Sequence, residues 1–249
     1  MAIQSNSSDV EVPIGLSLYT GIASVSVVAV NPTLAELAKL GVKLKTEPVY
    51  TDVQIGENVY NKLIFWMHNA THDFTTKLEI LCKPEHRIAK SGKFLYINKS
   101  GQTVFCDQDP SEQYDWYSDE GVRKAFTGED VLTDFVKAWA NTPSGGDCTL
   151  DTIEEVMKGN VSELTVLVDT LKNNKLRVLL GVKDGKYQEV YKKNFGRFKP
   201  QRDDTFVRAL NNEFSTFKAE YNTDLKLQPY SPELIVASEA APESESAPW

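Results

Sequence analysis

The sequence is poor in the side chains from which disulfides, metal sites and membrane spans are built. Its 249 residues include only three cysteines and three histidines. Cys82, Cys106 and Cys148 are odd in number and widely spaced, which argues against a disulfide framework and for reduced thiols that pack as small hydrophobic groups. No apolar run reaches the roughly 18 residues that cross a bilayer, and the first residues lack the basic-then-apolar order of a signal peptide. We therefore expect a cytoplasmic protein.

Sequence motifs of catalysis are missing as well. The chain has no phosphate-binding GxxxxGK[ST] loop, no GxSxG nucleophile elbow and no HExxH zinc motif. Asp107, Asp109 and Asp115 are close in sequence, but polar residues surround them, and a magnesium-dependent nuclease would need carboxylates in an apolar frame. A solvated acidic loop is the simpler interpretation of these three residues. We expect the protein not to be an enzyme.

Four residues, His68, His72, Cys82 and His86, raise the question of a metal. Tetrahedral zinc prefers ligand pairs held in tight turns, usually with two or more thiolates, whereas this group offers one thiol. His68 and Cys82 also lie on expected strands. Surface histidines and a core cysteine are the simpler interpretation, so we expect no cofactor, but the spacing leaves a zinc site open.

What the sequence does have is a strong segregation of charge. The whole chain carries −8, but residues 172–202 hold ten Lys and Arg against two acids, so this stretch is +8 and the rest is −16. Asp184-Gly185, between two apolar-rich runs, is typical of a tight β-hairpin turn. Aromatic residues are interleaved with the charges, as in proteins that stack bases while cations follow the phosphates. The alternative is a solvated strand face whose lysines discourage edge pairing.

Alternating apolar and polar residues predict five main strands, at 21–30, 59–68, 74–83, 175–183 and 186–193. An accessory hairpin is expected at 93–98 and 102–106. Helical spacing predicts a short helix after Pro32, three helices at about 127–141, 150–158 and 161–172, and a C-terminal helix over 203–221.

Three strands, a helical block and two strands is the order of the OB-fold, a five-stranded Greek-key barrel that binds oligonucleotides. We therefore expect an α+β fold: an OB-like antiparallel β-barrel or sheet with a helical insertion at about 111–172 and a C-terminal helix. A different α+β sandwich has the same order of elements. Residues 1–20 are expected to form a flexible N-terminal segment, 21–228 a single domain, and 229–249 a disordered acidic tail.

The last nineteen residues, SPELIVASEAAPESESAPW, contain four acids, three prolines and no base. Such a composition buries too little apolar area to fold. An acidic tail that closes with Pro248-Trp249 resembles the C-terminal tails of single-stranded DNA-binding proteins, and the organisation of the chain resembles such a protein from a tailed bacteriophage. The resemblance implies that Trp249 binds replication or recombination proteins, that the tail competes with DNA for the basic groove, and that the protein works in the host cytoplasm.

Together these features predict sequence-independent binding and protection of single-stranded DNA during phage DNA replication and recombination. The residues expected to contact DNA are Lys183, Lys186, Tyr187, Tyr191, Lys192, Lys193, Phe195, Arg197, Phe198 and Lys199, with Lys77, Lys93 and Tyr96 from a second basic window. The alternative is a structural protein of the phage particle or its assembly, whose basic hairpin meets an acidic neighbouring subunit.

Overall fold

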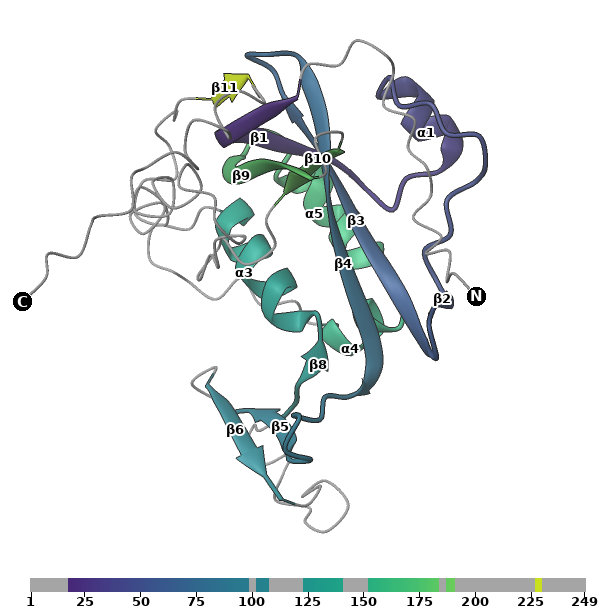
Figure 1. Ribbon diagram of the computed structural model, residues 1–249, viewed down its shortest axis with the longest axis vertical. Helices are drawn as coiled ribbons and strands as arrows, with labels where there is room; N and C mark the ends of the chain where they lie inside the picture. The colour runs from purple at the N-terminus through teal and green to yellow at the C-terminus, as the bar shows by residue number, and fades with distance from the viewer. Residues whose placement is uncertain are drawn as a thin grey trace, which may run out of the picture.

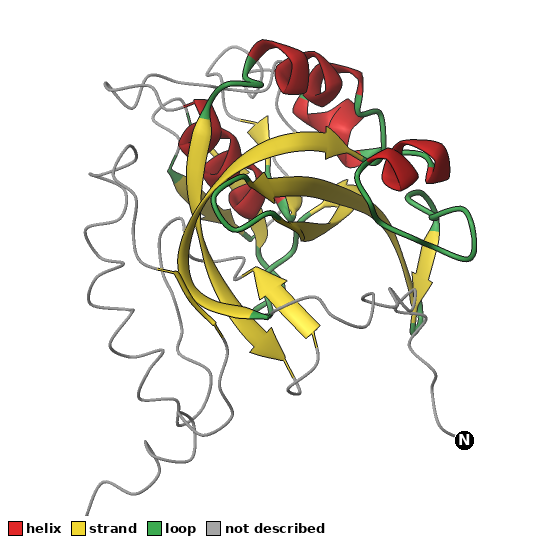
Figure 2. Ribbon diagram, turned by 90° about the horizontal axis from the view of Figure 1, so that it is seen from above, coloured by secondary structure: helices red, strands yellow, loops and turns green. Residues whose placement is uncertain are grey.

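The computed structural model describes residues 18–98, 102–107, 123–140, 152–183, 187–190 and 227–229. Within them the fold is mixed α+β and dominated by antiparallel sheets (Figures 1 and 2). The larger sheet contains β1 (Tyr19–Val30), β2 (Val53–Ile55), β3 (Asn58–Asn69), β4 (Phe74–His86), β8 (Phe126–Thr127), β9 (Lys175–Lys183), β10 (Tyr187–Val190) and β11 (Leu227–Pro229). The smaller sheet contains β5 (Phe94–Ile97), β6 (Thr103–Cys106) and β7 (Arg123–Lys124). The helices are α1 (Leu34–Lys39), α3 (Glu129–Ala140), α4 (Ile153–Met157) and α5 (Ser162–Thr170).

The larger sheet runs in the order β10-β9-β1-β3-β4-β8. Its central strand, β1, exchanges partners along its length: residues 21–26 pair with β9 on one edge, and residues 26–30 pair with β3 on the other. A register shift between Val27 and Ala29 interrupts the second pairing, and such bulges increase the local twist of a strand. The sheet curves far enough that Cα atoms of β10 come within 8 Å of Cα atoms of β4. No ladder joins these two strands among the described residues, so the sheet is not closed into a barrel.

The main core lies on the concave side of this sheet. Phe74, Thr76, Leu78 and Ile80 of β4 are buried and alternate with more exposed residues, as the period of two predicts. Helices α3, α4 and α5 cover the core (Figure 2). Helix α3 contributes the buried residues Leu132, Phe135, Val136 and Trp139, at the spacing of one helical face.

A second, smaller apolar cluster lies on the opposite face of β3. There α1 and the chain after it cover Ile64 and Trp66, with Leu37 fully buried between them. Asn31 fixes the end of β1 beside this cluster: its side chain accepts from the Ile64 N–H at 2.7 Å and donates to the Lys62 carbonyl at 2.9 Å. A φ of 43° turns the chain at Asn31 out of the sheet toward α1.

The five main strands that the sequence predicts are present, as are the accessory hairpin, the short helix and the three helices before β9. Several boundaries differ. β1 begins at Tyr19, inside the expected N-terminal segment, and the expected helical insertion also contains β7 and β8. β11 lies at the expected start of the tail and pairs with the first residues of β1. The rest of the tail and the expected helix at 203–221 lie outside the described residues.

Candidate nucleic-acid interface

The β9–β10 hairpin presents one predicted contact residue directly. Tyr187 is 49% exposed and is the Cα partner of Lys183 across the hairpin. Val190, three residues further along β10, is on the opposite face, and it and its register partner Leu180 are buried in the main core. Tyr187 is therefore at a register position that faces away from the core. A half-exposed tyrosine ring at the edge of a basic hairpin is suited to stacking on a base.

Most of the other predicted contacts lie outside the described residues: Lys186, Tyr191, Lys192, Lys193, Phe195, Arg197, Phe198, Lys199 and the partner-binding Trp249. One base of the +8 stretch, however, is not at the surface. Arg177 is fully buried on β9, opposite Ser24 of β1. Since the interior hides its guanidinium from solvent, Arg177 adds nothing to a surface for phosphates.

Gln188 ties the hairpin to the start of β1. Its side-chain amide donates to the carbonyls of Tyr19 and Gly181, both at 2.8 Å, and its carbonyl accepts from the Tyr19 N–H at 2.9 Å. The Tyr19 ring in turn stacks on Phe74, with ring centroids 5.0 Å apart. These contacts hold β10, the end of β9 and the β3–β4 turn at one end of the sheet, so the position of Tyr187 is fixed relative to β3 and β4.

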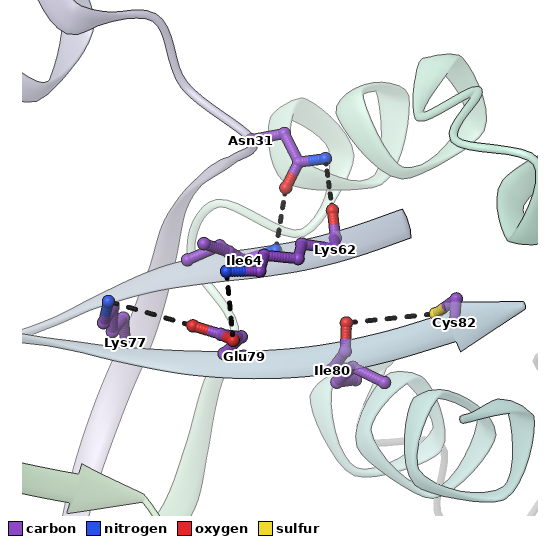
Figure 3. A network of polar contacts seen from close by, with 7 residues as sticks. All are labelled: Asn31, Lys62, Ile64, Lys77, Glu79, Ile80 and Cys82. Atoms are coloured by element: carbon purple, nitrogen blue, oxygen red, sulfur yellow. Dashed lines mark hydrogen bonds and ion pairs between the residues drawn. The ribbon is translucent and has the colours of Figure 1, made fainter. Parts of the chain in front are cut away.

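The face of β3 and β4 that points away from the main core, here called the outer face, carries a second group of cations. By alternation and register it consists of Tyr60, Lys62, Ile64, Trp66 and His68 on β3 and Thr75, Lys77, Glu79, Leu81 and Lys83 on β4. Figure 3 shows Lys62 and Lys77 on either side of Glu79, at N–O distances of 3.7 and 4.0 Å. The predicted contact Lys77 is therefore on this face, but its side chain is 29% exposed and already engaged by Glu79.

At the other end of the outer face, Lys83 lies over the Tyr60 ring, 4.8 Å from its centroid, and donates to the Asn58 side chain at 2.7 Å. The sequence interpretation did not select Tyr60, Lys62 or Lys83. The period of two in β4 does predict part of this group, because the alternation that buries Leu78 and Ile80 places Lys77 and Lys83 together on the opposite face. Lys62, Lys77 and Lys83 against Glu79 give the outer face a net charge of +2, but Lys62 is buried and α1 covers Ile64 and Trp66 on the same face, so Lys77 and Lys83 are its partly exposed cations.

The smaller sheet corrects one predicted contact and weakens another. Tyr96 is fully buried, with the ring of His86 packed edge-on at 4.5 Å, so its ring has no surface on which a base can stack. Lys93 is more accessible but forms an ion pair with Asp107 at 2.9 Å. The hydrogen bond from Lys93 to Asp107 raises the pKa of the lysine, and the same carboxylate offsets its charge toward phosphate.

The four residues considered for zinc do not converge. Cys82 is buried in the main core, and His68 lies on the outer face of β3 beside Thr75. His72 is next to the Tyr19 ring, and His86 packs against Phe94 and Tyr96. Within the part of the chain that the structure describes, no three His, Cys, Asp or Glu side chains gather closely enough to hold a metal ion.

None of the helices in the described ranges is long and apolar enough to span a bilayer. Comparison of the chain with protein-family models, curated proteins and solved structures found no match.

Proposed function

We propose that the protein binds single-stranded DNA without sequence preference and protects it during phage DNA replication or recombination. The observation that carries the proposal is the order of the strands. In an OB barrel, strand 1 lies between strands 2 and 4, and strand 5 returns beside strand 3. With β1, β3, β4, β9 and β10 as strands 1 to 5, the ladders β10-β9-β1-β3-β4 follow this order, and β10 approaches β4 without the ladder that would close the barrel.

This correspondence supports an OB-like interpretation of the sheet, in which β3 and β4 provide the ligand-binding strands. On their outer face, α1 covers Ile64 and Trp66 and Lys62 is buried, while Lys77 and Lys83 are partly exposed cations. The β9–β10 hairpin adds Tyr187 and the start of the basic stretch at residues 172–202. Cations beside an exposed aromatic ring are the combination that holds single strands without reading their sequence. The acidic tail and Trp249 extend the proposal to the recruitment of replication or recombination proteins.

The test is fluorescence anisotropy with a labelled 30-nucleotide poly-dT strand and its duplex as the competitor. We expect a preference for the single strand, and an affinity that falls with salt by about 0.7 log unit per phosphate contact per log unit of salt. Replacing Tyr187 by Ala should weaken binding about 5- to 150-fold, the equivalent of about 1–3 kcal/mol for one stacked base.

Tyr187→Phe is the matched control, because it retains the ring and removes only the hydroxyl. It should bind poly-dT as the wild type does. A salt-independent affinity, or equal binding of duplex and single strand, would contradict the proposal. If the alanine variant bound as tightly as the phenylalanine variant, Tyr187 would have no stacking role.

A further inference from the structure

The smaller sheet, β6-β5-β7, projects from the body of the molecule at the end opposite α1 and β11 (Figure 1). Leu95 and Tyr96, on opposite faces of β5, are both buried. Backbone hydrogen bonds fix this sheet to the end of β4: the Arg87 N–H donates to the Ala125 carbonyl at 2.8 Å, and the Ala125 N–H donates to the Leu95 carbonyl at 3.1 Å. The sheet is thus ordered, but one of its edges, β6, faces outward.

β6 has an unusual surface for an edge strand. Consecutive residues, Val104 and Phe105, are 38% and 56% exposed, and because alternate residues point to opposite faces, apolar surface is exposed on both sides of the strand. Edge strands normally carry lysine, proline or a bulge that prevents further pairing. The four residues of β6, TVFC, contain no charge, proline or glycine, and their ladder with β5 is regular.

The hydrogen-bonding groups of Phe105 also point outward. Leu95, its partner in β5, uses its own N–H and carbonyl on the side away from β6, with Arg87 and Ala125. Leu95 and Phe105 are therefore a non-hydrogen-bonded pair, in which the N–H and carbonyl of Phe105 face the open edge. The same holds by alternation for Thr103 and Asp107. Among the described residues, no strand pairs with this edge.

We propose that β6 pairs antiparallel with β6 of a second copy of this chain, so that the two projecting sheets join across a two-fold axis. If the two-fold axis is normal to the sheet, each residue lies opposite a residue whose side chain is on the same face of the joined sheet. This condition restricts the register of the two strands. In one such register, the outward N–H and carbonyl groups of Thr103, Phe105 and Asp107 form the hydrogen bonds between the copies. Phe105 then lies opposite Phe105 of the second copy. Val104 then lies opposite Cys106 of the second copy, and Thr103 opposite Asp107.

This arrangement explains why a second copy fits better than an unrelated strand. Apolar residues meet apolar residues or a thiol, and no like charges face each other. Asp107 is already paired with Lys93 inside its own sheet. The contact is limited to the four residues of β6 and Asp107, whereas stable interfaces bury roughly 1,200 Å² or more, so we expect a concentration-dependent dimer and not a permanent one. The dimer does not depend on DNA.

Sedimentation equilibrium without DNA, over a wide range of protein concentration, tests the pairing. The wild type should shift from monomer to dimer as the concentration rises. Phe105→Lys should raise the dimer dissociation constant at least about tenfold, because each copy places a charge in the apolar contact. Val166→Lys is the matched control: Val166 is 62% exposed on α5, outside the proposed contact, and its replacement should leave the dissociation constant unchanged.

Disulfide capture tests the register. In a chain with Cys148→Ser, the additional change Val104→Cys should give a covalent dimer on mild oxidation, because cross-strand residues in a non-hydrogen-bonded pair lie close enough for a disulfide. Adding Cys106→Ser should abolish it. A wild type that stays monomeric at every concentration would overturn the proposal, as would equal effects of the lysine variants at 105 and 166. A dimer that Val104→Cys does not capture would overturn the register.

Discussion

Gln188 acts at the start of β1 as a strand would, by satisfying both backbone groups of Tyr19. Its side chain also holds the Gly181 carbonyl, so that one residue joins β1, β9 and β10 through three hydrogen bonds. An alanine at this position removes the partner of the Tyr19 N–H, the Tyr19 carbonyl and the Gly181 carbonyl, all of which are partly buried. The cost of an unsatisfied polar group exceeds the net gain from making the bond.

We therefore predict that Gln188→Ala lowers the free energy of unfolding by about 1–3 kcal/mol, measured by urea denaturation. The Tyr19 amide, which donates to Gln188, should exchange its hydrogen faster in the variant. Gln54→Ala is the matched control, because Gln54 is exposed and its side chain donates to the nearby Gly56 carbonyl, so its loss should cost less than about 0.5 kcal/mol. Equal destabilisation by the two variants would show that the link at Gln188 is not important.

Single residues also show where a sequence pattern stops being informative. Tyr96 was expected to be accessible because it lies in a basic hairpin, yet it is buried, and the exposed ring of that sheet is Phe105. Apolar residues occupy both faces of β5, so a period of two cannot tell which face meets the core. Arg177 is a similar case: its charge suggested the surface, but its position on the central part of β9 buries it.

At the scale of elements, the junction between β4 and α3 depends on a close approach of two backbones. Gly128, immediately before α3, has a φ of 88°, and a Cβ there would overlap the backbone carbonyl oxygen of Leu81. Its carbonyl also accepts the first hydrogen bond of the helix, from the Leu132 N–H at 3.0 Å. Neither β4 nor α3 is able to move away easily, because both contribute buried side chains to the main core.

Replacing Gly128 by Ala should therefore lower the free energy of unfolding by about 2–5 kcal/mol, from left-handed backbone strain and overpacking together. Gly92→Ala separates the two causes. Gly92 has a similar φ of 82°, but a Cβ there meets nothing within 4 Å, so only the strain of about 1–2 kcal/mol should remain. Urea denaturation followed by circular dichroism measures both. If the two variants lost the same free energy of unfolding, the close approach of the two backbones at Gly128 would not contribute to the cost of the substitution.

The elements that the sequence predicts well are those whose own residues carry a long pattern. β4 and α3 belong to this group, because ten or more residues repeat one period. β7, β8 and β11 have two or three residues each, and they exist as strands only because β5, β4 and β1 supply their hydrogen-bonding partners. The approach of β10 to β4 is likewise non-local, since it depends on the curvature of all the strands between them.

For the whole molecule, the important property is that opposite charges are separated along one chain. Residues 172–202 carry +8, while the last nineteen residues carry four glutamates and no base. Burial of Arg177 removes one of these cations from the surface, so the acidic tail can neutralise a larger fraction of what remains. Attraction between exposed charges is screened within about 10 Å at 0.1 M salt, so any competition between tail and DNA depends on ionic strength.

Removing residues 233–249 should leave the affinity for poly-dT unchanged or raise it up to about tenfold at low salt, and the difference should vanish as salt screens both interactions. Replacing the four tail glutamates, Glu233, Glu239, Glu243 and Glu245, by Gln keeps the length and removes the charge. If charge is the cause, this variant should bind as the truncated chain does. Weaker DNA binding after truncation would contradict competition, because the tail would then contribute to the DNA contact and not oppose it.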